Sequence, residues 1–334
     1  MTWQIRQLKH GIHLPQIDWW LDAHKPVPRS IVSHAHFDHL AAHDEILCTP
    51  ATARLARARL RGHRIEHTLP FGHTEQLTPD STITLHPAGH IRGSAQCLID
   101  HATHGTLLYT GDFKLRPGRS AEPCATPRAD TLIMETTFGN PRYVFPPTEK
   151  ILADITTFCR DTLAAGANPI LYGYSLGKSQ EILSHLAGAR LPLMLHEQTA
   201  RMTRVYETLG IAFPPHAPFD PDPRAHAGHV IICPPQPENS AFLQKIPARR
   251  TAMISGWAID ASTIHRMRCD AAFPLSDHAD YNDLLRYVDL VRPRLVYTTH
   301  GHTAAFAKTL RDRGTEAWPL DKDTQLDLSL GSLP

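Results

Sequence analysis

The sequence lacks the features that mark membrane and secreted proteins. No apolar run reaches the roughly 18 residues that a membrane-spanning helix needs. The first residues, MTWQIRQLKHG, contain no apolar stretch typical of a signal peptide. The six cysteines include no CxxC pair, so they indicate neither a disulfide framework nor a thiolate zinc site. These absences predict a cytoplasmic protein with no membrane partner and with reduced, mostly packed thiols.

The chain also lacks an excess of either charge. It has 34 Lys+Arg and 33 Asp+Glu among 334 residues, so its composition gives no sign of a polyanionic partner. With 42% hydrophobic residues, it can bury the core of one large domain or two ordinary ones. Histidine is over-represented, with 23 copies. This excess suggests metal binding without locating the metal.

The pattern of apolar residues changes near residue 147. Before it, short β-type runs separated by turns predict strands at 29–35, 45–49, 81–88, 95–101, 106–111 and 130–136, with a helix at 50–63. After it, helices at 147–166 and 178–188 alternate with strands at 169–175 and 191–197, which is typical of parallel α/β structure. A proline-rich loop is expected at 213–229, then strands at 230–236 and 251–258. A helix at 281–293, a strand at 294–302 and a helix at 303–314 follow.

The segment SHAHFDHL, residues 33–40, is the strongest chemical signal. A β-type run ends there in four potential ligands, His34, His36, Asp38 and His39. A spacing of two along extended chain points His34 and His36 to the same side, and the following turn brings the other two nearby. Neutral imidazoles and carboxylates are ligands that zinc and manganese accept. Because a buried strand end is a poor place for four such groups on their own, a metal site is favoured over a solvated loop.

Three further candidate ligands follow other β-type runs. His90, Asp112 and His300 each come just after such a run, where loops gather side chains over the edge of a sheet. Any one of them alone would more often be a turn or cap residue. Together with residues 33–40 they favour a site for two metal ions, in which Asp112 can bridge. Two such ions about 3.5 to 4 Å apart are a recurrent arrangement for hydrolysing phosphodiesters.

These motifs resemble the metallo-β-lactamase superfamily. HxHxDH followed by a lone His and a lone Asp carries that resemblance. Glu135 in METTFGNP, His278 in SDHADY and His300 in TTHGH resemble the β-CASP nuclease branch, particularly its bacterial ligase-associated exonucleases. The implied fold class is α/β, an αββα metallo-β-lactamase sandwich over residues 1–140 and 272–334. The implied insertion is an α/β β-CASP domain over residues 141–271.

The resemblance also implies a role for each matching residue. One metal ion would be held by His34, His36 and His90, the other by Asp38, His39 and His300, with Asp112 bridging them. Asp22 would orient the ligands, and His278, oriented by Glu135, would protonate the leaving oxygen; Asp38 is counted with these two among the catalytic residues. Zinc is the expected ion, with manganese as the alternative.

The implied function is a metal-dependent nuclease in which the two metal ions supply the attacking hydroxide. Likeness to ligase-associated exonucleases favours an exonuclease on single-stranded or end-processed DNA in repair, with a DNA ligase or helicase as pathway partners. The histidine at position 300 is the form of the RNA-processing branch, so an RNA-processing exo- or endonuclease is the alternative. A thioester or lactone hydrolase would not need the insertion, and a non-catalytic subunit would have lost ligands.

Some motifs give weaker signals. YSLGKS, residues 174–179, lacks the first glycine of a phosphate-binding loop, because Tyr172 stands at that position. Lys178 opens a predicted helix that could face nucleic acid, and Arg92 and Ser94 follow a predicted ligand, so all three are expected to be substrate contacts. The arginines between residues 54 and 64 could contact phosphates or form a solvated helix face.

Overall fold

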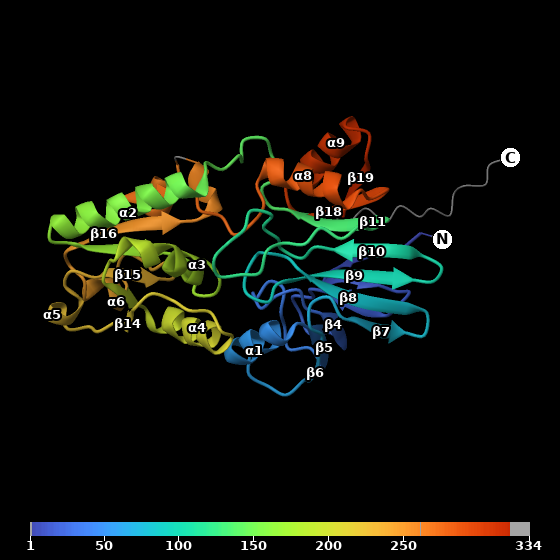
Figure 1. Ribbon diagram of the computed structural model, residues 1–334, viewed down its shortest axis with the longest axis horizontal. Coiled ribbons are helices and arrows are strands. Elements are labelled where there is room, and N and C mark those ends of the chain that lie inside the picture. Colours follow the sequence, from blue (N-terminus) through green and yellow to red (C-terminus); the bar gives the residue numbers. More distant parts are fainter. Residues whose placement is uncertain (1, 261, 321–334) are drawn as a thin grey trace.

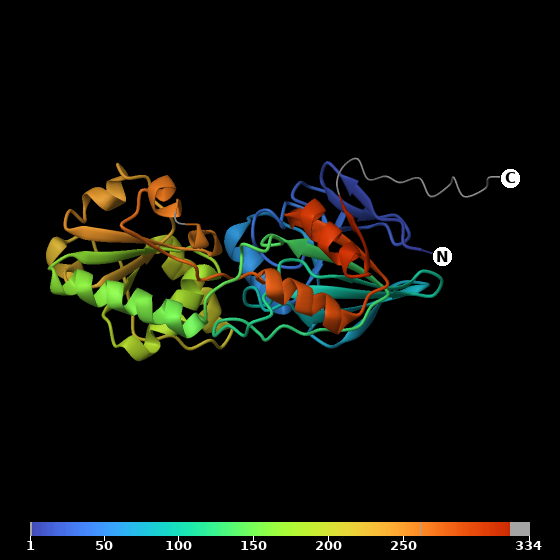
Figure 2. The ribbon, with the colours of Figure 1, turned by 90° about the horizontal axis from the view of Figure 1, so that it is seen from above.

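Three β-sheets make up the computed structural model, which describes residues 2–260 and 262–320 (Figure 1). Residues 321–334, the last part of the predicted sandwich domain, lie outside the described residues. The two sheets of residues 6–136 and 295–319 lie together, and the third sheet, built from residues 168–273, lies beside them in both views (Figure 2). The described helices include none long and apolar enough to cross a membrane.

The first sheet contains the N-terminal strands, and the second combines the middle of the chain with its C-terminal part. The first has the order β1 (Arg6–Leu8), β2 (Gly11–Leu14), β3 (Trp19–Leu21), β4 (Arg29–Ile31), β5 (Glu45–Cys48) and β6 (Ile65–Thr68). The second has the order β19 (Glu316–Pro319), β18 (Leu295–Gly301), β11 (Thr131–Thr136), β10 (Gly105–Tyr109), β9 (Ala95–His101), β8 (Ser81–Pro87) and β7 (Thr74–Thr78).

Alternation along the strands places one apolar layer between these two sheets. In β10, Leu107 and Tyr109 pack into the core shared with Ile31 and Leu47 of the first sheet. Leu108, between them, joins the cluster on the opposite face. Successive side chains of a strand point to opposite faces, so a sheet covered on both sides has apolar residues in both registers. The second sheet is therefore buried on both faces.

Helices cover the outer faces of the two sheets. Helix α1 (Pro50–Arg59) packs on the first sheet, and the Oγ1 of Thr49 caps it by accepting from the backbone N–H of Thr52. Helices α8 (Tyr281–Val291) and α9 (Thr303–Asp312) pack on the second sheet (Figure 2). The layers follow the order αββα, as the sequence predicts.

The third sheet is parallel throughout. Its order is β14 (Ala217–Pro218), β13 (Leu193–Leu195), β15 (Val230–Cys233), β12 (Asn168–Tyr172), β16 (Arg249–Ile254) and β17 (Ala271–Phe273). The helical segments of this unit are α2 (Thr148–Ala164), α3 (Lys178–His185), η1 (Leu186–Ala189), α4 (Glu197–Thr208), α5 (Pro223–His226), α6 (Ala241–Gln244), η2 (Gly256–Ile259) and α7 (Thr263–Met267). Apolar clusters lie on both faces of the sheet. This unit has the α/β character predicted for the insertion.

The structure corrects several predicted elements. The strand predicted at 251–258 ends at Ile254, because Ser255 caps the 3-10 turn η2 that begins at Gly256. The proline-rich loop at 213–229 contains the two-residue strand β14, which is tolerated because Pro218 lies on an edge strand. The strand predicted at 29–35 stops at Ile31, so residues 33–40 form an irregular segment after it.

Candidate metal centre

The predicted ligands come together at strand ends of the first and second sheets. Residues 34–39 follow β4, His90 follows β8, and Asp112 follows β10. The loops of the two sheets meet closely at Gly111, which has a φ of +53°. A Cβ at that position would lie 2.5 Å from the Cβ of Ser33, so only glycine allows this approach. The two sheets can therefore bring their ligand loops to a common point.

Four side chains, all buried except the half-buried His36, form what we call the inner cluster: His34, His36, His90 and Asp112. The Nδ1 of His36 lies 3.0 Å from the Nε2 of His34 and 3.2 Å from the Nε2 of His90. The Oδ2 of Asp112 lies 3.6 Å from the Nε2 of His34 and 3.8 Å from that of His90. One atom from each residue thus faces the same small volume.

Hydrogen bonds on the far side of each imidazole fix which nitrogen carries the proton. The Nε2 of His36 donates to the carbonyl of Leu176 at 3.1 Å, and the Nδ1 of His90 donates to the carbonyl of Asp277 at 2.8 Å. A carbonyl oxygen can only accept, so in each ring the proton lies on the nitrogen that faces the carbonyl. The lone pairs of His36 Nδ1 and His90 Nε2 therefore point into the inner cluster.

The tautomer of His34 follows from a chain of bonds. The Oγ of Ser33 donates to the carboxylate of Asp22, so it accepts from the Nδ1 of His34 at 2.9 Å. The Nε2 of His34 is then a third lone pair facing the same point. Hydrogen bonding of the outer nitrogen to a carbonyl or carboxylate network is how proteins orient metal-binding histidines.

Three lone pairs and a carboxylate at such distances repel one another unless a cation lies between them. Zinc–nitrogen bonds of about 2.0 to 2.1 Å in a tetrahedral site separate their nitrogens by roughly 3.3 Å, close to the separations seen here. Burial, and then the neighbouring imidazoles, hold the pKa of His34 well below its usual value and lower those of His36 and His90 to about 3 and about 4. The residues of the inner cluster therefore fit a metal ion.

The remaining predicted ligands, His39, Asp38 and His300, lie beside this cluster, and we call them the outer group. The Nε2 of His39 lies 3.2 Å from the Oδ2 of Asp112 and 3.6 Å from the Oδ2 of Asp38. The His300 ring centroid lies 5.4 Å from that of His39. His39 is buried, whereas the Asp38 side chain is 77% exposed and His300 is exposed. Only His39 of this group is in direct contact with the inner cluster.

Asp22 connects the two halves of the centre. Its buried carboxylate accepts from the Nδ1 of His39 and the hydroxyl of Tyr109, both at 2.8 Å, and from the N–H and hydroxyl of Ser33. Burial alone would lower the pKa of His39, but the carboxylates of Asp112 and Asp22 outweigh it and raise that pKa well above its usual value. Asp22 therefore orients His39 directly and His34 through Ser33.

His278 and Glu135 form a pair next to the inner cluster. The Nδ1 of His278 lies 2.9 Å from a carboxylate oxygen of Glu135, which also accepts from the N–H of Phe113. The His278 ring lies 4.6 Å from the His90 ring, and its side chain is 20% exposed. Burial opposes protonation, but Glu135 and Asp112 outweigh it and raise the pKa of His278 to about 10. This pair can hold a proton beside the centre.

The third sheet's unit reaches into the centre, which the sequence did not reveal. Besides the Leu176 carbonyl that holds His36, the ammonium of Lys178 lies 2.8 Å from the carboxylate of Asp277 and donates to the carbonyl of Leu275. Gly177 between them has a φ of +86°, and a Cβ there would clash with Ile91. A backbone carbonyl has no side-chain signature, so only the structure could identify it.

The three predicted substrate contacts are all engaged within the protein. Lys178 is 1% exposed and paired with Asp277, so its position does not favour direct contact with a phosphate. The Oγ of Ser94 accepts from the N–H groups of His90 and Ile91, which orders the His90 loop. Arg92 is ion-paired with Glu122 at 2.9 Å. These residues support the site rather than present free donors to a substrate.

The two packed sheets carry a cluster of histidines and aspartates at their strand ends, and an α/β insertion contacts this cluster. Together these features define a metal-binding class of protein. Residues 265–319 match the family model described as "Zn-dependent metallo-hydrolase RNA specificity domain". This match lies in the C-terminal part of the sandwich and agrees with the resemblance of the chain to the β-CASP branch of the metallo-β-lactamase superfamily.

Relatives cover different parts of the chain. It is 62% identical over 334 residues, 100% of its length, to a "Probable DNA ligase" of Opitutus terrae. It is 29% identical over 318 residues, 85% of its length, to "5' exonuclease Apollo" of Rattus norvegicus. It is 32% identical over 160 residues, 46% of its length, to "Transcription termination factor FttA" of Methanothermobacter thermautotrophicus. The chain spans 32%, 54% and 24% of these relatives' lengths, respectively.

Proposed function

We propose that this chain is a nuclease that hydrolyses phosphodiester bonds of nucleic acid with the help of two divalent cations, zinc in the first instance. The observation that carries the proposal is the contact between the His278–Glu135 pair and the inner cluster. A metal site next to a held proton supplies the two things that phosphodiester hydrolysis needs, stabilisation of the attacked phosphate and protonation of the leaving oxygen.

Each residue has one task in this proposal. The inner cluster would hold one cation, the outer group the other, and Asp112 would contact both. When bound, these cations supply positive charge that activates water and neutralises phosphate oxygens. His278 gives its proton to the sugar oxygen as the phosphorus–oxygen bond to that oxygen breaks, and later regains a proton from solvent. Glu135 keeps the His278 ring oriented, so that the Nε2 of His278 faces the substrate.

The most favoured substrate is DNA with an accessible end. The relatives named as an exonuclease and as a probable DNA ligase support a DNA substrate, an exonuclease mode and a ligation-linked repair partner. The division into a sandwich of residues 1–140 and 272–334 and an insertion of residues 141–271 is part of the same proposal.

RNA processing is the second candidate. The matched family model is described by RNA specificity, and a transcription termination factor is among the relatives. His300, the residue that favoured RNA at the level of sequence, lies beside His39.

Matched end-labelled strands test the proposal. Purified protein is stripped with a chelator, reloaded with zinc or manganese, and incubated with single-stranded DNA or RNA carrying a 5′-phosphate or a 5′-hydroxyl. We expect a ladder of shortened DNA products only after metal is restored, and none from an Asp112→Asn variant. RNA ladders with intact DNA would replace the first candidate with the second. Intact strands of both kinds with metal-loaded protein would contradict the nuclease assignment.

A further inference from the structure

Two exposed aromatic side chains lie at the carboxyl ends of strands in the third sheet. Trp257 in η2, just after β16, is 40% exposed, and Tyr174, just after β12, is 64% exposed. Both line a cavity of about 340 Å³, together with Pro235 from the end of β15. Open parallel sheets bind ligands outside the carboxyl ends of their strands. The position and the exposed rings both point to a ligand.

The cavity adjoins the proposed general acid. The Trp257 ring centroid lies 4.7 Å from that of Phe138, and the Phe138 centroid lies 6.0 Å from that of His278. The contact is tightly packed, because a Cβ at Gly256 would lie 2.5 Å from the Phe138 ring. One buried ring therefore separates Trp257 from the residue that faces the reacting phosphate.

Tyr174 lies two residues before Leu176, whose carbonyl accepts from the Nε2 of His36 in the inner cluster. The loop that carries Tyr174 therefore contacts the metal centre directly. The cavity thus opens beside the place where the scissile phosphate would lie.

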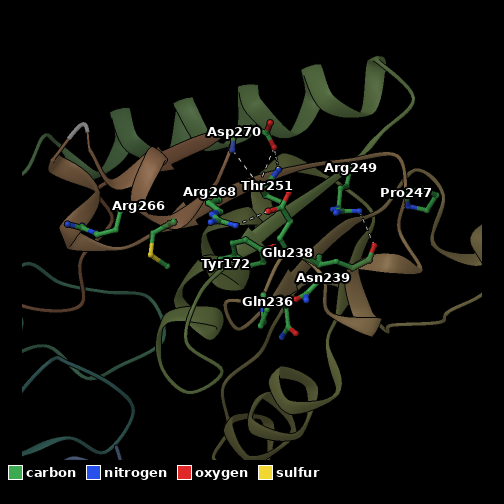
Figure 3. A pocket seen from close by; sticks show the side chains of 13 residues that line it. Tyr172, Gln236, Glu238, Asn239, Pro247, Arg249, Thr251, Arg266, Arg268 and Asp270 are labelled. Atoms are coloured by element: carbon green, nitrogen blue, oxygen red, sulfur yellow. Dashed lines mark hydrogen bonds and ion pairs between the residues drawn. The ribbon is translucent and has the colours of Figure 1, made fainter.

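A cation is available on the wall of the cavity. Arg266 in α7 lines it and is held by a 3.0 Å hydrogen bond to the Oγ1 of Thr263. Arg266 and Met267 also line a second cavity of about 960 Å³, where Figure 3 shows Arg266 on the opposite side from Arg249 and Pro247. Both cavities therefore share a basic wall, which suits a ligand that carries phosphates next to a ring.

We propose that the cavity of Trp257 and Tyr174 binds one unpaired base of the substrate strand by stacking, next to the phosphate that is cleaved. This rests on the proposed nuclease function and adds how the strand is held. A base in a duplex is already stacked and paired, so the cavity selects single-stranded or frayed ends. Stacking on aromatic side chains is tolerant of sequence, because every base has a flat face.

The test uses a series of single-stranded DNA oligonucleotides, each with one abasic nucleotide at a different distance from the cleaved bond. Binding is measured by fluorescence anisotropy and cleavage by product ladders, for the metal-loaded wild-type protein and for Trp257→Ala. Stacking contributes about 1 to 3 kcal/mol per base, so loss of the base or of Trp257 should weaken binding about 5- to 150-fold.

The loss of affinity caused by the abasic position and the loss caused by Trp257→Ala should not add. We expect one abasic position to weaken binding by the wild-type protein while making no further difference to Trp257→Ala. Trp257→Phe, which keeps a flat ring, should recover most of the affinity and guards against a folding defect in the alanine variant. The matched control is Trp318→Ala in β19, whose ring is 38% exposed and lies against Arg311, and it should bind as the wild type does.

The failures of the two proposals are distinguishable. If the wild-type protein cleaves but every abasic strand binds as tightly as the intact strand, the stacking proposal is wrong and the nuclease proposal stands. Additive losses of affinity in Trp257→Ala would also overturn the stacking proposal, because the base would then bind at another place. If no strand is cleaved, the nuclease proposal fails, and the anisotropy series still decides whether the cavity holds a base.

Discussion

The two halves of the metal centre differ in how firmly their ligands are held. In the inner cluster, each imidazole is buried or half-buried, and its outer nitrogen is bonded to Ser33, Leu176 or the carbonyl of Asp277. In the outer group, only His39 is held in this way, by Asp22. Asp38 is largely exposed, and His300 has a φ of +56°, which is uncommon for a residue with a side chain.

The difference indicates that the two halves bind metal with unequal affinity. Ligands already fixed in the binding geometry lose little conformational freedom when an ion arrives. Exposed ligands such as Asp38 must be ordered by the ion itself, which costs about 0.5 to 1.5 kcal/mol for each immobilised side chain. We therefore expect the inner cluster to retain its ion under conditions that empty the outer group.

Asp112→Asn should have the largest effect on activity, because Asp112 faces ligands of both halves of the centre. Its Oδ2 faces His34 and His90 on one side and His39 on the other. Both sites lose a charged ligand, so activity should fall roughly 10⁴-fold or more. Metal content by mass spectrometry and initial cleavage rates check this, with Asp100→Asn, at the exposed position of β9, as the control. A variant with two ions and the wild-type rate would show that Asp112 is not shared.

His278→Ala should lower the rate about 10³-fold while leaving the metal content unchanged. General acids contribute about 10²- to 10⁴-fold, and this histidine is oriented by Glu135 rather than by an inner-cluster residue. The rate and the metal content are measured on the same preparation, beside His302→Ala as the control. Because the rings of His278 and His90 are close, a parallel fall in metal content would make His278 a ligand and remove the general acid from the account.

Asp38→Asn should affect the outer group alone. It removes the exposed carboxylate 3.6 Å from the Nε2 of His39, so we expect one ion to remain and the rate to drop roughly 10²-fold. His36→Ala provides the matched comparison, because it should release the inner ion. If both variants retained the same ion under the same chelator, the two halves would not be distinct.

Asp22→Asn should have the smallest effect and should reach both halves. The carboxylate orients His39 directly and His34 through Ser33, and loss of such a partner typically weakens metal binding about 10- to 100-fold. Competition with a fluorescent chelator measures the affinity. Asp18→Asn is the control, since the Asp18 side chain is 71% exposed. An unchanged affinity in Asp22→Asn would deny this residue an orienting role.

Local patterns predicted much of the fold. The strand predicted at 95–101 coincides with β9, and the helices at 147–166 and 281–293 appear as α2 and α8, because their apolar residues recur with a strand or helix period. Helix α4 escaped prediction since its buried face is formed largely by Thr199, Ala200, Thr203 and Tyr206, which give a weak apolar pattern. The three N-terminal strands are too short for their alternation to stand out.

For the site, the sequence predicted the ligands and the orienting residues Asp22 and Glu135, but not the supports that come from backbone carbonyls and from the insertion. The histidines and aspartates are concentrated at strand ends, where their types indicate metal chemistry. The carbonyl of Leu176 and the pairing of Lys178 with Asp277 depend on segments 140 and 99 residues away from their partners. Such contacts arise from the packing of the insertion on the sandwich, which no local pattern encodes. Lys178 was accordingly expected to face nucleic acid, whereas its ammonium is buried.

Stepwise removal of metal from the wild-type protein tests the unequal centre most directly. Protein loaded with zinc is equilibrated against increasing chelator, and the ions per chain are counted by mass spectrometry while cleavage of a single-stranded DNA is followed. We predict two ions at the start, a plateau at one ion, and loss of cleavage at the first step. A single ion throughout, or two ions lost together, would contradict the account.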